Sequence, residues 1–158
     1  VQTCALPILS NEFKLICVKL TQLAKSSFIS WTFSVCKLDI SKLFNDKSKS
    51  WFLPKVEGED INFYKYEGQL IYGKFNVLEP MGASLSDITP DLIIVPALVI
   101  DKSGYRLGYG KGYYDRFLKK ISSKIITLSP IFSELIVETL PVDRYDEKIK
   151  VIVSDWYF

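Results

Sequence analysis

The run DLIIV, residues 91–95, decides the fold because it is nearly continuous in apolar, mostly β-branched side chains. Strands that are covered on both faces in a parallel sheet have this pattern, whereas strands with one solvent-exposed face alternate apolar and polar residues. The run therefore predicts a central strand. Two similar runs, over Lys124–Leu128 and Lys150–Val153, predict further buried strands.

The rest of the chain supplies helices and a further strand. Apolar residues at helical spacing, with Ser10 as an N-cap, predict an amphipathic helix over Ser10–Lys25. Aromatic and β-branched residues predict a strand over Ser27–Phe33, followed by a helix near Ile40–Asn45. Tyr113–Lys120 is again helical in pattern. This alternation predicts an α/β protein of three layers, Rossmann-like, with a mostly parallel sheet flanked by helices.

Shorter segments lie between these elements. Trp51–Leu53 predicts a short strand that Pro54 stops. A polar turn follows at Glu57–Asp60, and extended structure resumes over Ile61–Tyr66. Glycine and proline punctuate Leu70–Met81, which predicts a loop with a short strand. None of these segments has the composition of a linker between domains.

Composition limits the kind of partner. The chain of 158 residues is 48% apolar, which is enough for one compact domain. Its net charge of +2 is too small to predict nucleic acid or a membrane surface as the main partner. The longest apolar run, Leu92–Ile100, is far shorter than the roughly 20 residues that cross a bilayer. Val1–Leu9 lacks the features of a secretory signal. We therefore expect a cytoplasmic monomer that acts on small molecules.

The chain contains no histidine, which excludes an imidazole base and the Ser-His and Cys-His pairs of nucleophilic catalysis. Its three cysteines, Cys4, Cys17 and Cys36, are spaced too widely for a CxxC motif and are interpreted as buried thiols of a reducing compartment. Any chemistry must therefore use phosphate, a metal, lysine or carboxylate.

A glycine-rich run, RLGYGKGYYD over residues 106–115, comes after the strand of residues 91–100 and just before the predicted helix. Open α/β sheets bind ligands at the carboxyl ends of their strands. Gly108, Gly110 and Gly112 allow backbone N–H groups to converge on an anion, and the start of the helix adds a partial positive charge. The run therefore predicts a phosphate-binding loop.

Charged residues support this interpretation of the loop. Arg106, Lys111 and Arg116 supply three cations that could contact phosphate. Asp115 is the one acid among them and is suited to Mg²⁺, which takes one or two carboxylates together with substrate phosphates. The run is neither a Walker A motif nor the GxGxxG dinucleotide motif. A glycine-rich turn with solvated charges is the alternative.

The strand and the loop together resemble the signature of the 5-formyltetrahydrofolate cyclo-ligase family, also called 5,10-methenyltetrahydrofolate synthetase. The similar stretch runs from Pro90 to Ala97 and through Asp101–Gly104 to Arg106–Arg116. Further pieces occur in the family's order over about residues 10 to 155. These pieces are Phe52–Val56 with Phe63, Gly73–Phe75 through Leu78–Pro80, and Leu140–Pro141 with Tyr145 and Asp146.

The resemblance implies ATP- and Mg²⁺-dependent conversion of 5-formyltetrahydrofolate to 5,10-methenyltetrahydrofolate, with release of ADP and phosphate. The implied mechanism is attack of the formyl oxygen on the γ-phosphate, followed by ring closure by N10 and loss of phosphate. Such chemistry asks the protein mainly for positioning and charge neutralisation, and it needs no histidine.

The resemblance also implies site residues. Arg106 and Lys111 are implied as catalytic, and Asp115 and Asp146 as the Mg²⁺ ligands. The implied ATP-binding residues are Arg106, Leu107, Gly108, Tyr109, Gly110, Lys111, Gly112, Tyr113 and Tyr114. The implied folate-binding residues are Ile61, Phe63, Tyr109, Gly110, Lys111, Gly112 and Tyr113.

The chain departs from the family's pattern at four places. Lys37 replaces a glutamate of the folate pocket, Ile61 replaces a methionine before the pocket aromatic, and Tyr145 replaces a histidine before Asp146. Val1–Ile8 lacks the basic pair that the family's first helix extends to ATP, so we interpret residues 1–9 as truncated or non-native and residues 10–158 as a single cyclo-ligase-like domain. We therefore expect weakened ATP binding, and a non-catalytic nucleotide- or folate-binding relative is the alternative function.

Overall fold

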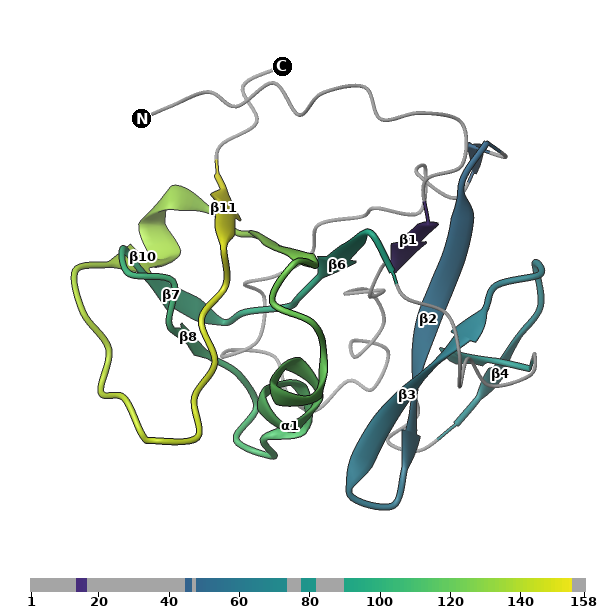
Figure 1. Ribbon diagram of the computed structural model, residues 1–158, viewed down its shortest axis with the longest axis horizontal. Coiled ribbons are helices and arrows are strands. Elements are labelled where there is room, and N and C mark those ends of the chain that lie inside the picture. The colour runs from purple at the N-terminus through teal and green to yellow at the C-terminus, as the bar shows by residue number, and fades with distance from the viewer. Residues whose placement is uncertain (1–13, 17–44, 47, 74–77, 82–89, 155–158) are drawn as a thin grey trace, which may run out of the picture.

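The structure, a computed structural model, describes residues 14–16, 45–46, 48–73, 78–81 and 90–154. One large sheet dominates it, and this sheet contains β1 (Lys14–Ile16), β2 (Ser50–Glu57), β3 (Asp60–Lys65), β6 (Leu92–Ile94), β9 (Ile126–Pro130) and β11 (Val151–Val153). The strand order is β11-β9-β6-β1-β2-β3, parallel from β11 to β2 and antiparallel between β2 and β3 (Figure 1). The predicted mostly parallel α/β sheet is confirmed.

β6 is the central strand that the sequence predicts. It pairs in parallel with β9 on one side and with β1 on the other, and all three of its residues are buried. Leu92 and Ile94 pack with Trp51 and Leu128 on one face, while Ile93 lies in the larger core on the opposite face. Both faces of β6 are therefore covered by apolar side chains, as an unbroken apolar run requires.

The helix α1 (Tyr113–Lys120) covers the larger core, and its predicted bounds are confirmed. Leu118 is buried, and the Phe117 ring lies 4.7 Å from the ring of Phe63 on β3. Of the described residues, only these eight form an α-helix. No helix in the described part of the chain is long and apolar enough to span a bilayer.

Two small sheets complete the described fold. One contains β7 (Val99–Asp101), β8 (Arg106–Leu107) and β10 (Ile136–Val137) in the order β10-β7-β8. The other pairs β4 (Leu70–Tyr72) with β5 (Leu78–Pro80), so the predicted loop over Leu70–Met81 holds two short strands instead of one. The first small sheet matters for function because β8 leads directly into the glycine-rich run.

The predicted helix over Ser10–Lys25 is wrong at Lys14–Ile16, which form β1 between β2 and β6. Leu15 and Ile16 fit a helical stripe, but adjacent apolar residues equally suit a strand buried in a parallel sheet, and periodicity alone does not separate the two. The rest of that segment, with the strand predicted over Ser27–Phe33 and most of the helix predicted near Ile40–Asn45, lies outside the described residues.

The prediction that Pro54 ends its strand is also wrong, since β2 continues through it to Glu57. The Tyr66 N–H donates to the Trp51 carbonyl at 2.8 Å, and hydrogen-bonded pairs alternate along an antiparallel ladder. Pro54, opposite Phe63, therefore falls on a pair that exchanges no hydrogen bonds, and its nitrogen faces away from β3. No ladder bond is lost at this position, so the proline is tolerated.

The β2–β3 hairpin places a carboxylate beside its turn. The Tyr64 hydroxyl donates to Glu57, as does the Asn62 side-chain amide at 2.6 Å. These bonds, the one from Tyr64 first, hold the pKa of Glu57 below its ordinary value. A lowered carboxyl pKa stabilises the fold above the unfolded-state pKa, and this contribution is lost as the pH falls through the folded-state pKa.

We therefore expect Tyr64→Phe to raise the pKa of Glu57. The difference in melting temperature between the variant and the wild type should shrink on acidification, because the lost bond involves only the ionised carboxylate. An NMR titration of the Glu57 side-chain carboxyl carbon measures the pKa directly. Superimposable titration curves for the two proteins would show that the hydroxyl does not act on this carboxylate.

Candidate functional site

The predicted phosphate loop joins β8 to α1 at the surface. Gly112 is the N-cap of α1 with φ 64°, a left-handed conformation that glycine adopts without strain. Tyr109 is 60% exposed, and the Lys111 side chain is exposed as well. The exposed loop therefore ends at the N-terminus of the helix. A helix N-terminus carries a partial positive charge and free backbone N–H groups, which together bind anions.

Arg106 lies beneath this loop and faces inward. Its side chain is only 4% exposed, and its Nη2 donates to Oδ1 of Asp115 at 3.0 Å. The guanidinium carbon lies 5.5 Å from the centre of the Tyr114 ring. A Cβ at Gly108 would come within 3.0 Å of Nη1, so the glycine leaves room for the guanidinium. The pair joins β8 to α1 and closes the base of the loop.

Arg116 also has protein partners. Its Nη1 donates to the Lys111 carbonyl at 3.0 Å, its Nη2 donates to the Glu59 carbonyl, and its Nε lies 3.8 Å from Oδ1 of Asp60. Lys111 forms no salt bridge with any residue in the described part of the chain. Of the three predicted cations, Lys111 is therefore the one whose charge is directed to solvent.

The two predicted metal ligands come from neighbouring segments. The Glu147 N–H donates a long hydrogen bond to Oδ1 of Asp115, with 3.5 Å between the nitrogen and the oxygen. This contact brings the residue after Asp146 against α1. Oδ2 of Asp146 accepts the Asp143 N–H at 2.7 Å within its own turn. Among the described residues, neither Oδ2 of Asp115 nor Oδ1 of Asp146 accepts a hydrogen bond. Each carboxylate thus retains one oxygen for a ligand.

This donor set fits Mg²⁺. The ion prefers oxygen ligands and usually takes one or two carboxylates, with phosphate and water oxygens as the remainder. The described residues contain no group of three or more His, Cys, Asp or Glu that could hold a metal ion on its own. A site of this kind therefore depends on a phosphate ligand to complete the coordination.

The predicted folate residues on β3 are not at the surface. Ile61 and Phe63 are each 4% exposed and belong to the larger core beneath α1. Tyr113 packs against the same core from the first turn of the helix, partly exposed. The structure thus groups the loop with Asp115 and the Asp146 turn, and it separates Ile61 and Phe63 from them by the helix.

Asp101 is a supporting residue to which the sequence analysis assigns no role. Its side chain is 2% exposed; Oδ1 accepts the N–H groups of Ser103 and Tyr105 at 2.9 Å each, and Oδ2 accepts the Leu140 N–H at 3.2 Å. This carboxylate holds the β7–β8 turn to the segment that precedes the Asp146 turn. The sequence signal is the Asp-x-Ser-Gly stretch, since aspartate often bonds the backbone two residues later in a turn.

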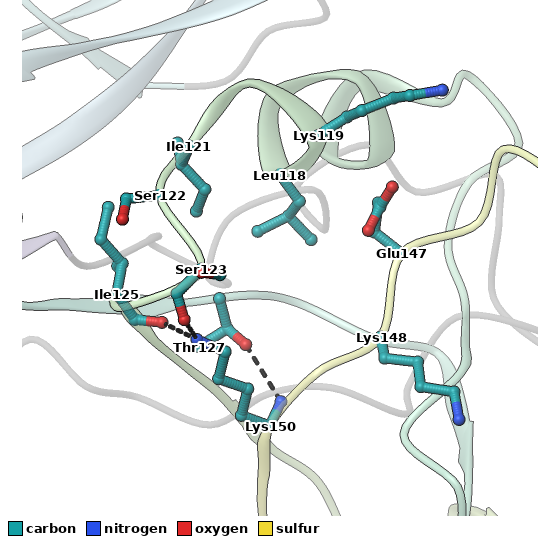
Figure 2. Close-up of a pocket in the computed structure, with 10 residues that line it drawn as sticks. All are labelled: Leu118, Lys119, Ile121, Ser122, Ser123, Ile125, Thr127, Glu147, Lys148 and Lys150. Carbon is teal, nitrogen blue, oxygen red and sulfur yellow. Dashed lines mark hydrogen bonds between the residues drawn. The ribbon is translucent and has the colours of Figure 1, made fainter.

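A pocket of about 240 Å³ lies beneath the C-terminal end of α1, away from the loop (Figure 2). One of the four charged residues that line it is already engaged, because Lys150 Nζ donates to the carbonyls of Ser123 and, at 2.6 Å, Ile125. The backbone N–H of Lys150 donates to Thr127 Oγ1 at 3.0 Å. None of the predicted site residues lines this pocket. The candidate site is therefore the loop and not this pocket.

The fold and the loop define the class: a parallel α/β protein in which a glycine-rich segment leads from a short strand into a helix that carries a carboxylate. Residues 15–155 match the 5-formyltetrahydrofolate cyclo-ligase family. The chain belongs to that family, and the resemblance in the strand and loop is confirmed.

Individual relatives agree with this assignment. The 5-formyltetrahydrofolate cyclo-ligase of Mus musculus is 43% identical over 69 residues, which cover 41% of this chain and 34% of the mouse protein. The mitochondrial 5-formyltetrahydrofolate cyclo-ligase of Arabidopsis thaliana is 30% identical over 155 residues, covering 77% of this chain and 55% of the relative. These matches therefore span about a third and about half of the two relatives.

A solved structure shows the same fold. The 5,10-methenyltetrahydrofolate synthetase of Aquifex aeolicus superposes with a TM-score of 0.71 at 32% identity, over 95% of this chain and 72% of that protein. The likeness extends beyond the loop to the whole described sheet.

Proposed function

We propose that this chain catalyses the ATP- and Mg²⁺-dependent conversion of 5-formyltetrahydrofolate to 5,10-methenyltetrahydrofolate, with release of ADP and phosphate. The observation that carries the proposal is the loop: Lys111, which is exposed and forms no salt bridge with a described residue, precedes the N-terminus of α1, and the Glu147 N–H brings the Asp146 turn to Asp115 on the same helix. Cyclo-ligase and methenyltetrahydrofolate synthetase are the names of the relatives that share this region.

In this proposal the loop from Arg106 to Tyr114 binds ATP. Backbone N–H groups near Gly112 and the Lys111 ammonium contact the phosphates, and the helix N-terminus adds its partial charge. Asp115 and Asp146 hold Mg²⁺, which neutralises phosphate charge when it is bound. Arg106 supports the loop from below through its pair with Asp115. The folate lies against Tyr109–Tyr113, with Ile61 and Phe63 as the apolar floor behind α1.

The proposed reaction has two steps. The formyl oxygen attacks the γ-phosphorus, so that an O–P bond forms and the bond to the ADP oxygen breaks. N10 of the folate then attacks the activated carbon, a C–N bond forms, inorganic phosphate leaves with the formyl oxygen, and the proton of N10 is released. The protein supplies position and charge in both steps, which the loop can provide without a histidine.

A non-catalytic relative that only binds nucleotide or folate is the second candidate. The observation that favours it is Lys37, a cation where the family's pocket has an acid. Lysine donates hydrogen bonds but cannot accept them, so it cannot replace a carboxylate against N–H groups of the pterin. Position 37 lies outside the described residues. Binding of ATP without turnover would favour this candidate.

The proposed activity is tested by mixing the purified chain with 5-formyltetrahydrofolate, Mg²⁺ and ATP and following the absorbance of the methenyl product. We expect product that depends on ATP and appears with one ADP per turnover. A reaction without ATP serves as the control. A folded protein that forms no product when all three components are saturating would contradict the proposal.

Lys111→Ala is expected to lower kcat/KM for ATP by about 10- to 100-fold, the range for loss of a charged hydrogen bond of roughly 1.5–3 kcal/mol. The melting temperature should stay unchanged, because the side chain is exposed and forms no salt bridge with a described residue. Steady-state kinetics at varied ATP concentration measure the effect. Lys124→Ala, which removes an exposed lysine beyond α1, is the matched control. Equal kinetics for the two variants would place the phosphate site elsewhere.

A further inference from the structure

Arg116 on α1 connects the glycine-rich loop before the helix to the distant turn of the β2–β3 hairpin. It lies in the second turn of α1, and its guanidinium donates hydrogen bonds to two backbone carbonyls outside the helix. The Nη1 group donates to the Lys111 carbonyl in the loop at 3.0 Å, and Nη2 donates to the Glu59 carbonyl in the turn of the β2–β3 hairpin, 57 residues away. One side chain therefore holds the loop and the hairpin turn together.

The remaining contacts of Arg116 strengthen this link. Its Nε lies 3.8 Å from Oδ1 of Asp60, and its guanidinium carbon lies 5.2 Å from the centre of the Tyr113 ring. A Cβ at Gly112 would come within 3.0 Å of Nη1, so this glycine leaves space for the guanidinium. All three nitrogens of the group are thus directed at protein atoms, and the planar fork is committed to positioning.

The hairpin side of the link has a second anchor. Lys120, one turn further along α1, places Nζ 3.1 Å from Oδ1 of Asp60. Beneath it, the Phe63 ring of the hairpin packs on the Phe117 ring of the helix. The hairpin turn, the helix and the loop therefore form one connected unit, in which Arg116 is the part that reaches the loop.

We propose that Arg116 is a positioning residue that locks the phosphate loop to the turn of the β2–β3 hairpin, so that the loop keeps one fixed arrangement. It does not bind phosphate, unlike the role that its place among the loop cations predicts. The identity of the ligands that the loop binds rests on the proposed function, whereas the mechanical link rests on the contacts alone. A lock of this kind lowers the cost of ordering the site when ligands bind.

The link is tested by amide hydrogen exchange on the ligand-free protein, with Arg116→Gln as the variant. We expect exchange to accelerate about threefold to tenfold in residues 57–61 and 107–112 together, while the amides of β6 and β9 keep wild-type rates. Lys119→Gln is the matched control, since it removes a positive charge from the same helix. The Lys119 ammonium lies over the Tyr145 ring, 5.6 Å from its centre. Because no ligand is present, the result does not depend on the proposed activity.

A second variant distinguishes loss of the link from a general loss of stability. If Arg116→Gln also accelerates exchange in β6 and β9, Arg116→Lys decides, because it keeps the charge at this position but cannot span the Lys111 and Glu59 carbonyls. Faster exchange in both segments of Arg116→Lys, with wild-type rates in β6 and β9, supports the link. Wild-type exchange in residues 107–112 of the deciding variant overturns it.

Steady-state kinetics separate positioning from phosphate binding. The proposed function places both ATP and the folate on this loop, so Arg116→Gln should raise KM for ATP and KM for the folate by similar factors, about fivefold each. Arg116→Lys should recover little, since a point charge cannot span the Lys111 and Glu59 carbonyls. A rise in KM for ATP alone would assign Arg116 to the phosphates and overturn the inference.

Discussion

Gly104→Ala is expected to lower the free energy of unfolding by about 3 kcal/mol, the sum of backbone strain and overpacking of this size. A Cβ at this position would lie 2.4 Å from the Ile149 backbone oxygen, and Gly104 has φ 94°. The Ile149 N–H donates to the Gly104 carbonyl at 2.8 Å, so the two backbones cannot separate without losing that bond. Urea unfolding followed by circular dichroism measures the change.

Gly68→Ala is the matched control for this prediction. Gly68 has a similar φ of 90°, but a Cβ there would meet no atom within 4 Å. The control therefore carries the backbone strain without the clash, and we expect it to lose only about 1 kcal/mol. An equal loss in the two variants would show that the approach of Ile149 does not restrict residue 104.

Asp115→Ala is expected to lower the free energy of unfolding by about 3 kcal/mol, because it leaves a buried charge without its partner. The charge is that of Arg106, whose side chain is 4% exposed and bonded to Asp115. The same variant should abolish measurable turnover, since it also removes a proposed Mg²⁺ ligand. Urea unfolding and the product assay measure the two effects separately.

Two further variants separate stability from activity at this pair. Asp146→Ala removes the other proposed metal ligand without exposing a buried cation, so it should lose turnover but little stability. Arg106→Met combined with Asp115→Ala should recover part of the lost stability, because replacing both members of a buried pair costs less than removing one. No recovery in the double variant would mean that the pair does not account for the loss.

Much of the fold was predictable from local pattern. The unbroken, β-branched apolar run of β6 predicts a buried strand, the pattern of α1 predicts a helix, and both predictions are confirmed. The predictions for Lys14–Ile16 and Pro54 were wrong because the secondary structure at these positions depends on strands that are distant in sequence. A short apolar run becomes β1 only between β2 and β6, and a proline fits β2 only where its nitrogen faces away from β3.

The site was predictable in position but not in the role of each charge. The glycine spacing located the loop, yet composition alone treated Arg106, Lys111 and Arg116 as equivalent cations. Their difference arises from contacts across the chain: Arg116 bonds Glu59, and the Glu147 N–H approaches Asp115 from 32 residues away. Such partners carry no local sequence signal, so the burial of Arg106 and the protein contacts of Arg116 emerge only in three dimensions.

Ligand-dependent amide exchange tests whether residues 106–115 bind the phosphates of ATP. With saturating ATP and Mg²⁺, we expect slower exchange in residues 106–115, and a much smaller change in Lys111→Ala at the same concentrations. Unchanged exchange in that segment, with protection appearing instead at Ser122 and Ser123 beside the pocket beneath α1, would show that the loop is not the phosphate site.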